Sequence, residues 1–180
     1  MVEFKPILKT IFSYGVLIFL YFILQTAFFP RFSLAGVSPN IMIILVSTIG
    51  FAKGANPGMT VGVICGLLLD IFASGYFGMY ALILVVIGFL NGSFRQVFFG
   101  DDMKLPLLLI GSSDLLYGAM VYIFTYVPRG KLDITYYFMN VMMPEAVYTI
   151  LVAMLLYFPI IRLDEWLKKN EKRNTVKIKG

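Results

Sequence analysis

Histidine is absent from this chain of 180 residues, and cysteine occurs once. Without an imidazole, the chain can carry neither Ser-His nor Cys-His catalysis, rhomboid-type proteolysis included, nor a histidine-ligated zinc or haem, nor the usual histidine pH switch. A single cysteine excludes an intramolecular disulfide, so we expect Cys65 to act as a small packing residue. Phosphate-binding loops, metal-ligand clusters and the Gly-x-Ser-x-Gly elbow are also missing. The sequence therefore predicts no enzyme, no cofactor and no metal site.

Charged residues are scarce as well, at 14% of the chain, whereas 59% of residues are hydrophobic and the mean hydropathy is +0.86. A soluble domain would carry about 25% charged residues. Apolar runs of about 20 residues recur along the chain, and runs of this length are typical of transmembrane helices. The composition predicts an integral membrane protein with one bundle and no second domain.

Charged and turn residues divide the chain into an all-α, six-transmembrane-helix bundle. The predicted spans are Ile7–Phe29, Pro39–Ala52, Pro57–Ala73, Tyr76–Phe94, Leu105–Val127 and Pro144–Ile161. The second span is short, because about 15 residues rise only about 22 Å against a hydrocarbon core of about 30 Å. We expect it to be shielded by the other helices.

Proline marks three predicted helix starts, each beside a capping or acidic residue. These starts are Ser38-Pro39, Asn56-Pro57 and Pro144-Glu145. In the connection before the last span, Asp133 is predicted to cap a short helix through Tyr136, Tyr137 and Phe138, whose aromatic rings suit the headgroup region.

The distribution of basic residues predicts the orientation. If both termini are cytoplasmic, only Arg31, Arg129 and Lys131 of the fifteen Lys and Arg residues lie outside, which is a strong positive-inside bias. The net charge of +5 then reflects orientation, and no nucleic-acid partner is expected. We predict a six-span membrane domain over residues 1–162 and a basic cytoplasmic juxtamembrane tail over residues 163–180 that rests on anionic membrane lipids.

A ladder of glycines leads to an aspartate in the third span. Gly54, Gly58, Gly62 and Gly66 are four residues apart, and Asp70 follows at the same spacing. This spacing keeps small residues near one helix face, where another helix can approach closely. An ionised Asp at a helix centre costs about 2.5–3.5 kcal/mol on insertion scales, so it needs partners. We interpret Asp70 as a polar clasp that accepts hydrogen bonds from adjacent helices; a proton or solute pathway is the alternative.

A second small-residue patch with a carboxylate lies in the fifth span. Gly111 precedes Asp114, and Gly118 follows it by one turn. We interpret Asp114 as a neutral or hydrogen-bonded acid that packs against a neighbouring helix, and Glu145 as a first-turn acid near the outer surface.

Several segments, taken in chain order, carry a family resemblance. They are Leu24-Gln25, Ser38-Pro39-Asn40, the Gly-x-x-x-Gly-Leu-x-x-Asp stretch from Gly62 to Asp70, Gly78 with Ala81-Leu82, Asp114, Pro144-Glu145 with Tyr148, and the span end at Arg162. Together they resemble the MreD family, the membrane protein of the bacterial rod-shape system. The resemblance covers most of the chain and is most specific from the second to the fourth span. It departs at Thr149, where many members have asparagine.

This resemblance implies a protein of the bacterial cytoplasmic membrane without catalysis of its own, a scaffold or regulator of the rod complex (elongasome). Its partners would be an MreC-like membrane protein and, through the complex, a RodA-type glycosyltransferase, a penicillin-binding transpeptidase and the actin-like MreB. It would maintain cell shape by supporting side-wall peptidoglycan synthesis. The candidate packing and functional residues are Pro39, Asn40, Gly58, Gly62, Gly66, Asp70, Gly78, Gly111, Asp114, Gly118, Pro144 and Glu145.

The MreD family also resembles, at fold level, the substrate-binding subunits of energy-coupling-factor vitamin transporters, which are six-span proteins of similar size. A solute-binding subunit of a vitamin-type transporter is therefore the alternative function. Against it, the first span lacks the Ala-x-x-x-Ala pattern through which such subunits dock their energising partner. A third possibility, a proton-coupled channel or carrier, needs more connected carboxylates than Asp70 and Asp114 supply.

Overall fold

The computed structural model describes residues 4–33, 36–72, 76–95, 104–130 and 133–177. Within these ranges the chain is helical with short connections and has no β-strand, as expected for an all-α protein. The elements are α1 (Phe4–Ile23), the π-helix η1 (Leu24–Phe28), the 3-10 helix η2 (Phe29–Phe32), α2 (Ile41–Lys53), α3 (Ala55–Phe72), α4 (Met79–Phe94), α5 (Lys104–Val121), the π-helix η3 (Tyr122–Tyr126), the 3-10 helix η4 (Val127–Arg129), α6 (Ile134–Tyr137), the π-helix η5 (Phe138–Met142) and α7 (Met143–Lys177).

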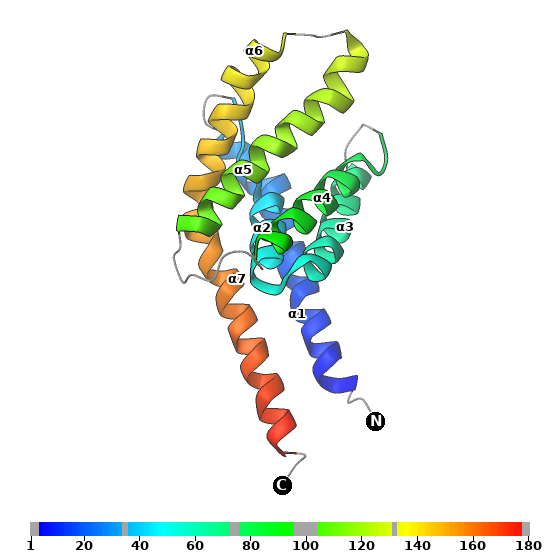
Figure 1. The fold of residues 1–180 in the computed structure, drawn as a ribbon, viewed down its shortest axis with the longest axis vertical. Helices are drawn as coiled ribbons and strands as arrows, with labels where there is room; N and C mark the ends of the chain where they lie inside the picture. Colours follow the sequence, from blue (N-terminus) through cyan, green and yellow to red (C-terminus); the bar gives the residue numbers. More distant parts are fainter. Residues whose placement is uncertain (1–3, 34–35, 73–75, 96–103, 131–132, 178–180) are drawn as a thin grey trace.

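These elements form helical runs that correspond to the predicted spans. Four runs are long and apolar enough to cross a membrane: Lys9–Phe32, Ala55–Phe72, Lys104–Arg129 and Ile134–Leu167. Two more, Ile41–Lys53 and Met79–Phe94, are apolar but shorter. Figure 1 shows an elongated bundle in which both ends of the chain lie at the same end. The count of six spans and the cytoplasmic side of the chain ends stay predictions.

The short helix α2 lies at the centre of this bundle. Every residue from Ile41 to Gly50 is buried, and α2 contacts α3, α4, α5 and α7 (Figure 1). A helix that is apolar on all sides belongs in an interior. The expectation that other helices shield the second span is confirmed.

The start of α2 differs from the prediction. The helix begins at Ile41 and its N-cap is Asn40, whose side-chain oxygen accepts the Ile43 N–H at 3.4 Å. Ser38 is therefore not the cap, and Pro39 lies before the helix rather than at its first position. Asparagine is as good a cap as serine, and the first amide groups of α2 have partners on other helices, described below, that favour the later start.

The start of α3 also differs from the prediction. Gly54 alone joins α2 to α3, with a φ of 105° that favours glycine, and its N–H donates to the Gly50 carbonyl oxygen at 2.7 Å. Ala55 is already helical, so Asn56 does not precede the helix as its cap. Pro57 lies in the first turn, where a missing N–H costs little.

The last helical run begins at Ile134, ten residues before the predicted start at Pro144. Asp133 caps α6 by accepting the Tyr136 N–H at 3.3 Å, as predicted. The π-helix η5 then carries the chain from α6 into α7 without a break. Pro144 therefore lies inside a continuous helical run, although Pro144 and Glu145 both fall in the first turn of α7 itself, as predicted.

Each π-helix of the described residues ends two residues before a proline, namely Pro30, Pro128 or Pro144. The residue just before each proline donates its N–H to a carbonyl five positions back: Phe29 to Leu24, Val127 to Tyr122 and Met143 to Phe138. In a regular α-helix the proline ring would clash with the carbonyl four positions back. The wider π-helical turn accommodates the ring, which explains how the helix continues past Pro144.

Candidate functional site

Three glycines of α3 bring α3 and α4 into backbone contact. A Cβ added to Gly62 would lie 2.5 Å from the Leu84 carbonyl oxygen, and one added to Gly58 would lie 2.5 Å from that of Gly88. At Gly66 a Cβ would overlap the backbone of α4. The neighbours are main-chain atoms, which cannot rotate away, so these positions require glycine. We call this contact the glycine seam.

The opposite side of the glycine seam was missed from the sequence. On α4, a Cβ at Gly88 or Gly92 would overlap the backbone of α3 or of the turn before it. On α2, a Cβ at Gly50 would lie 2.9 Å from the Gly88 carbonyl oxygen. The Gly88-x-x-x-Gly92 spacing in the fourth span was the available signal. Gly54 belongs to the turn before α3 and not to the seam.

Asp70 closes the end of the glycine seam. Its two carboxylate oxygens accept the backbone N–H groups of Tyr80, at 3.0 Å, and Ala81, at 3.1 Å. These are the second and third residues of α4, whose own N-cap, Gly78, has φ of 92° and no side chain to supply an acceptor. Asp70 is buried, and it caps α4 from α3 in the way an N-cap side chain normally would. The expected clasp to backbone amides is therefore present.

The N-terminus of α2 is a second buried cluster. The Asn40 N–H donates to the Thr149 hydroxyl oxygen of α7 at 2.9 Å, and the Ile41 N–H donates to the Gln25 side-chain oxygen of η1 at 2.5 Å. The first amide groups of a helix have no partner inside that helix. Here they receive partners from both neighbouring helical runs. The sequence missed Gln25 and Thr149 in this role, because they lie 16 and 109 positions from the amides that they accept and so leave no local signal.

Two acids lie beside this cluster. Asp114 of α5 is 3% exposed, and the Thr149 side chain lies next to its carboxyl group. Within the described residues, neither Asp114 oxygen has a partner at good hydrogen-bond geometry. Glu145 of α7 lies close enough to interact with Asp114 electrostatically. The positive end of the α2 dipole favours carboxyl groups here. We call Gln25, Asn40, Asp114, Glu145 and Thr149 the α2 cap cluster.

Gly111 and Gly118 make a looser contact than the glycine seam. A Cβ on Gly111 would lie 2.6 Å from the Ile150 Cδ1 of α7, and one on Gly118 would lie 2.9 Å from the Met142 Cγ of η5. These neighbours are flexible side chains rather than backbone. The two glycines therefore let α5 pack closely on the last helical run, but glycine is less strictly required at these positions than in the glycine seam.

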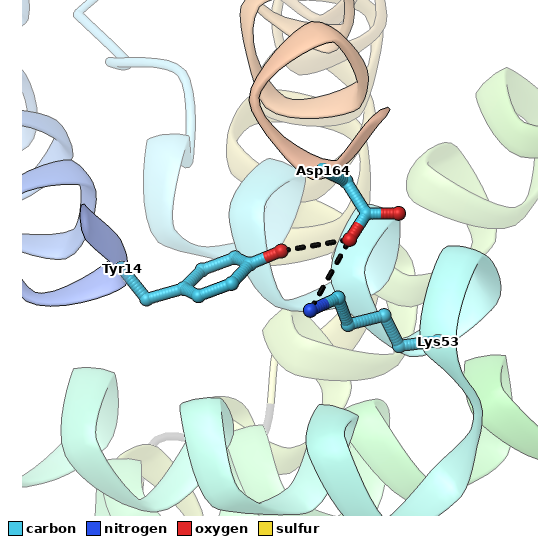
Figure 2. A network of polar contacts seen from close by, with 3 residues as sticks. All are labelled: Tyr14, Lys53 and Asp164. Carbon is cyan, nitrogen blue, oxygen red and sulfur yellow. Dashed lines mark hydrogen bonds and ion pairs between the residues drawn. The ribbon is translucent and has the colours of Figure 1, made fainter. Parts of the chain in front are cut away.

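A third polar contact joins α1, α2 and α7, as Figure 2 shows. Lys53 Nζ lies 3.2 Å from Asp164 Oδ1, and the Tyr14 hydroxyl donates to the same oxygen at 2.9 Å. The Lys53 ammonium also lies 4.3 Å from the centroid of the Tyr14 ring. Asp164 is buried, although the sequence assigned it to the tail. Lys53 and Asp164, which in the sequence lie just beyond predicted spans, thus help to hold α1, α2 and α7 together.

The clasp of Asp70, the α2 cap cluster and the Lys53 contact share one chemical property: apart from Asp114, most of their polar groups cap helices or join them. In the described part of the chain, no three His, Cys, Asp or Glu side chains gather where they could hold a metal ion. A cavity with a volume of about 370 Å³ lies between α5, η3, α6 and η5 and has an almost wholly apolar lining that includes Tyr122, Phe138 and Met142. The arrangement is suited to holding helices in place.

Comparison with protein families identifies the chain. The family model described as rod shape-determining protein MreD matches residues 7–165. The chain belongs to the MreD family. As an MreD protein it is a rod shape-determining membrane protein, in line with its four membrane-capable helical runs. Comparison with curated proteins and with solved structures gives no match.

The region matched to MreD contains the glycine seam, the α2 cap cluster and the Lys53 contact. MreD is a family of shape-determining membrane proteins and not a known enzyme family.

Proposed function

We propose that this chain is a non-catalytic scaffold of the rod complex that binds an MreC-like membrane protein and thereby supports side-wall peptidoglycan synthesis. The family match over residues 7–165 is the observation that carries the proposal. A RodA-type glycosyltransferase and a penicillin-binding transpeptidase would then be reached through the complex, and MreB indirectly from the cytoplasmic side.

The packing supports a scaffold in physical terms. The glycine seam removes side chains between α3 and α4, so these helices have little freedom to slide past each other. The outward faces of α1 and α7, in contrast, carry large uncovered apolar side chains, such as Phe12, Phe19, Leu151 and Leu155. Such faces meet lipid or the helices of other membrane proteins. A rigid core with exposed apolar helices suits a protein that acts by holding partners.

Co-purification from the native bacterium tests this proposal. The tagged chain, extracted in mild detergent, is expected to retain an MreC-like protein in near-equal amount. Gly66→Leu, which forces α3 away from α4, should reduce the recovered partner by about tenfold if a seam-dependent surface contributes about 1.4 kcal/mol to binding. Ala27→Leu, at an exposed position of η1, is the matched control and should retain the partner.

Two results would count against the scaffold. One is recovery of no MreC-like protein with the wild-type chain, together with tight binding of a vitamin to the purified protein, which would favour the transporter alternative. The other is a normal rod shape in cells whose only copy carries Gly66→Leu, with full partner recovery.

A further inference from the structure

A groove with a volume of about 610 Å³ lies between α1, the last turn of α2 and α3. Its apolar length is lined by Ile18 and Phe19 of α1 and by Ile64 and Leu68 of α3. Gly15 of α1 also lines it, and a Cβ there would meet nothing within 4 Å. We call this feature the α1–α3 groove. It is separate from the glycine seam and from the α2 cap cluster.

One end of the α1–α3 groove is polar. Lys53, Asn56 and Thr60 line the groove where α2 turns into α3. From Asn56 to Leu68 the α3 helix rises by about 18 Å. One leaflet of the hydrocarbon core is about 15 Å deep, half of about 30 Å. The groove thus has the length of one leaflet, with a polar end and an apolar remainder.

The polar end is at the level expected for lipid headgroups. Lys53 pairs with Asp164 of α7, and Trp166 follows two residues later with its ring half exposed. The Lys9 ammonium lies 4.3 Å from the centroid of the Trp166 ring. Tryptophan and lysine together are typical of the membrane–water interface.

Charge and size indicate the occupant. Among the described residues that line the α1–α3 groove, the charged one is Lys53. Its ammonium lies 3.2 Å from Asp164 Oδ1, but its side chain is 23% exposed and an ammonium has three donors, so it retains hydrogen-bonding capacity for an anion at the headgroup end. A helix about 10 Å wide fills roughly 400 Å³ per turn, so the groove would take in only about one and a half turns of a partner helix. A single acyl chain fits a narrow apolar groove of this length.

We propose that the α1–α3 groove is a specific site for one anionic phospholipid, with its phosphate at Lys53 and one acyl chain along α1 and α3. The phosphate oxygens accept hydrogen bonds from the Lys53 ammonium and the Asn56 side-chain amide, and charge-assisted hydrogen bonds of this kind are strong. The acyl chain covers the exposed Phe19 and Ile64 and the partly buried Leu68. The site differs from general attraction of a basic tail to the membrane surface, because it needs both the cation and the groove.

Native mass spectrometry of the delipidated protein in detergent tests the site. Dioleoyl-phosphatidylglycerol, dioleoyl-phosphatidylcholine and inorganic phosphate are titrated separately. We expect a one-to-one adduct with phosphatidylglycerol, at least about tenfold tighter than with phosphatidylcholine, and no retained phosphate. Gly15→Leu should fill the groove and weaken the adduct by about tenfold, with a melting temperature close to wild type because the space at Gly15 is open. Ala27→Leu is the control outside the groove.

Three further variants separate charge from folding. Lys53→Gln should remove the preference for phosphatidylglycerol over phosphatidylcholine, whereas Lys53→Arg should keep it. Asp164→Asn breaks the ion pair with Lys53 but keeps the cation, so a retained preference in this variant distinguishes the lipid site from the contact with Asp164. Equal binding of both phospholipids by the wild-type protein, unchanged binding by Gly15→Leu, retention of phosphate alone, or a crosslink from Ile64 to a partner helix in place of lipid would each overturn the proposal.

Discussion

Asp70 stabilises a helix to which it does not belong. Its carboxylate accepts the two first-turn N–H groups of α4 that Gly78, lacking a side chain, leaves without an acceptor. In a bilayer no water replaces such a partner, so an unpaired amide would lower the stability of the folded protein by its full desolvation cost. The carboxylate in turn gains from the positive end of the α4 dipole. One side chain therefore resolves the polar requirements of both helices.

We predict that Asp70→Leu lowers the free energy of unfolding by about 1–3 kcal/mol, because two buried amide groups lose their acceptor. Asp70→Asn should cost less, since it keeps one side-chain oxygen. Thermal unfolding in detergent measures both. Asp133→Ala removes the exposed cap of α6 and should cost less than about 1 kcal/mol. Equal losses for Asp70→Leu and Asp133→Ala would contradict the role of the clasp.

At the scale of elements, α3 and α4 behave as one unit because their backbones touch. We predict that Gly66→Leu lowers the melting temperature more than Ala27→Leu does. The physical reason is that overpacking costs about 1–3 kcal/mol or more where the neighbour is main chain. Gly111→Leu should be milder, because its neighbour is the movable end of Ile150. The melting temperatures of the three variants in one detergent provide the test; the reverse order for Gly66 and Gly111 would refute the seam.

The sequence predicts these elements well where the signal is local and poorly where it is not. Apolar runs and the spacing of four residues predicted the helical runs and one side of the glycine seam. The start of α2 was wrong because its amide partners, Gln25 and Thr149, come from distant segments. The pair Pro144-Glu145 predicts the start of the last helix, and α7 does begin at Met143. The run extends back to Ile134 because a π-helical turn accommodates the proline, and such a turn leaves no clear pattern in the residues.

At the scale of the whole molecule, both chain ends lie at one end of the bundle and α6 lies at the other (Figure 1). The contact of Lys53, Tyr14 and Asp164 fixes α1 and α7 to α2 (Figure 2). The uneven distribution of basic residues predicts that the end of the bundle with both chain termini faces the cytoplasm. The orientation is open to direct measurement, since the natural Cys65 is fully buried and should not react.

We predict that Tyr136→Cys, at an exposed position of α6, reacts with a membrane-impermeant maleimide in intact bacterial cells. Glu165→Cys, at an exposed position of α7, should react only after the membrane is permeabilised. The unaltered chain serves as the background control. Labelling of Glu165→Cys in intact cells, with Tyr136→Cys protected, would reverse the orientation.

The central position of α2 also constrains how the protein is made. Its Asn40 amide bonds to Thr149, which leaves the ribosome 109 residues later. Until then the nascent second segment is too short to span the bilayer alone, and part of its backbone has no acceptor in hydrocarbon. We therefore expect the early segments to remain within the insertion machinery or at the bilayer surface until the last segment has been synthesised. Assembly becomes complete only when the C-terminal segment is released, so a truncated chain would be an early target for membrane proteases.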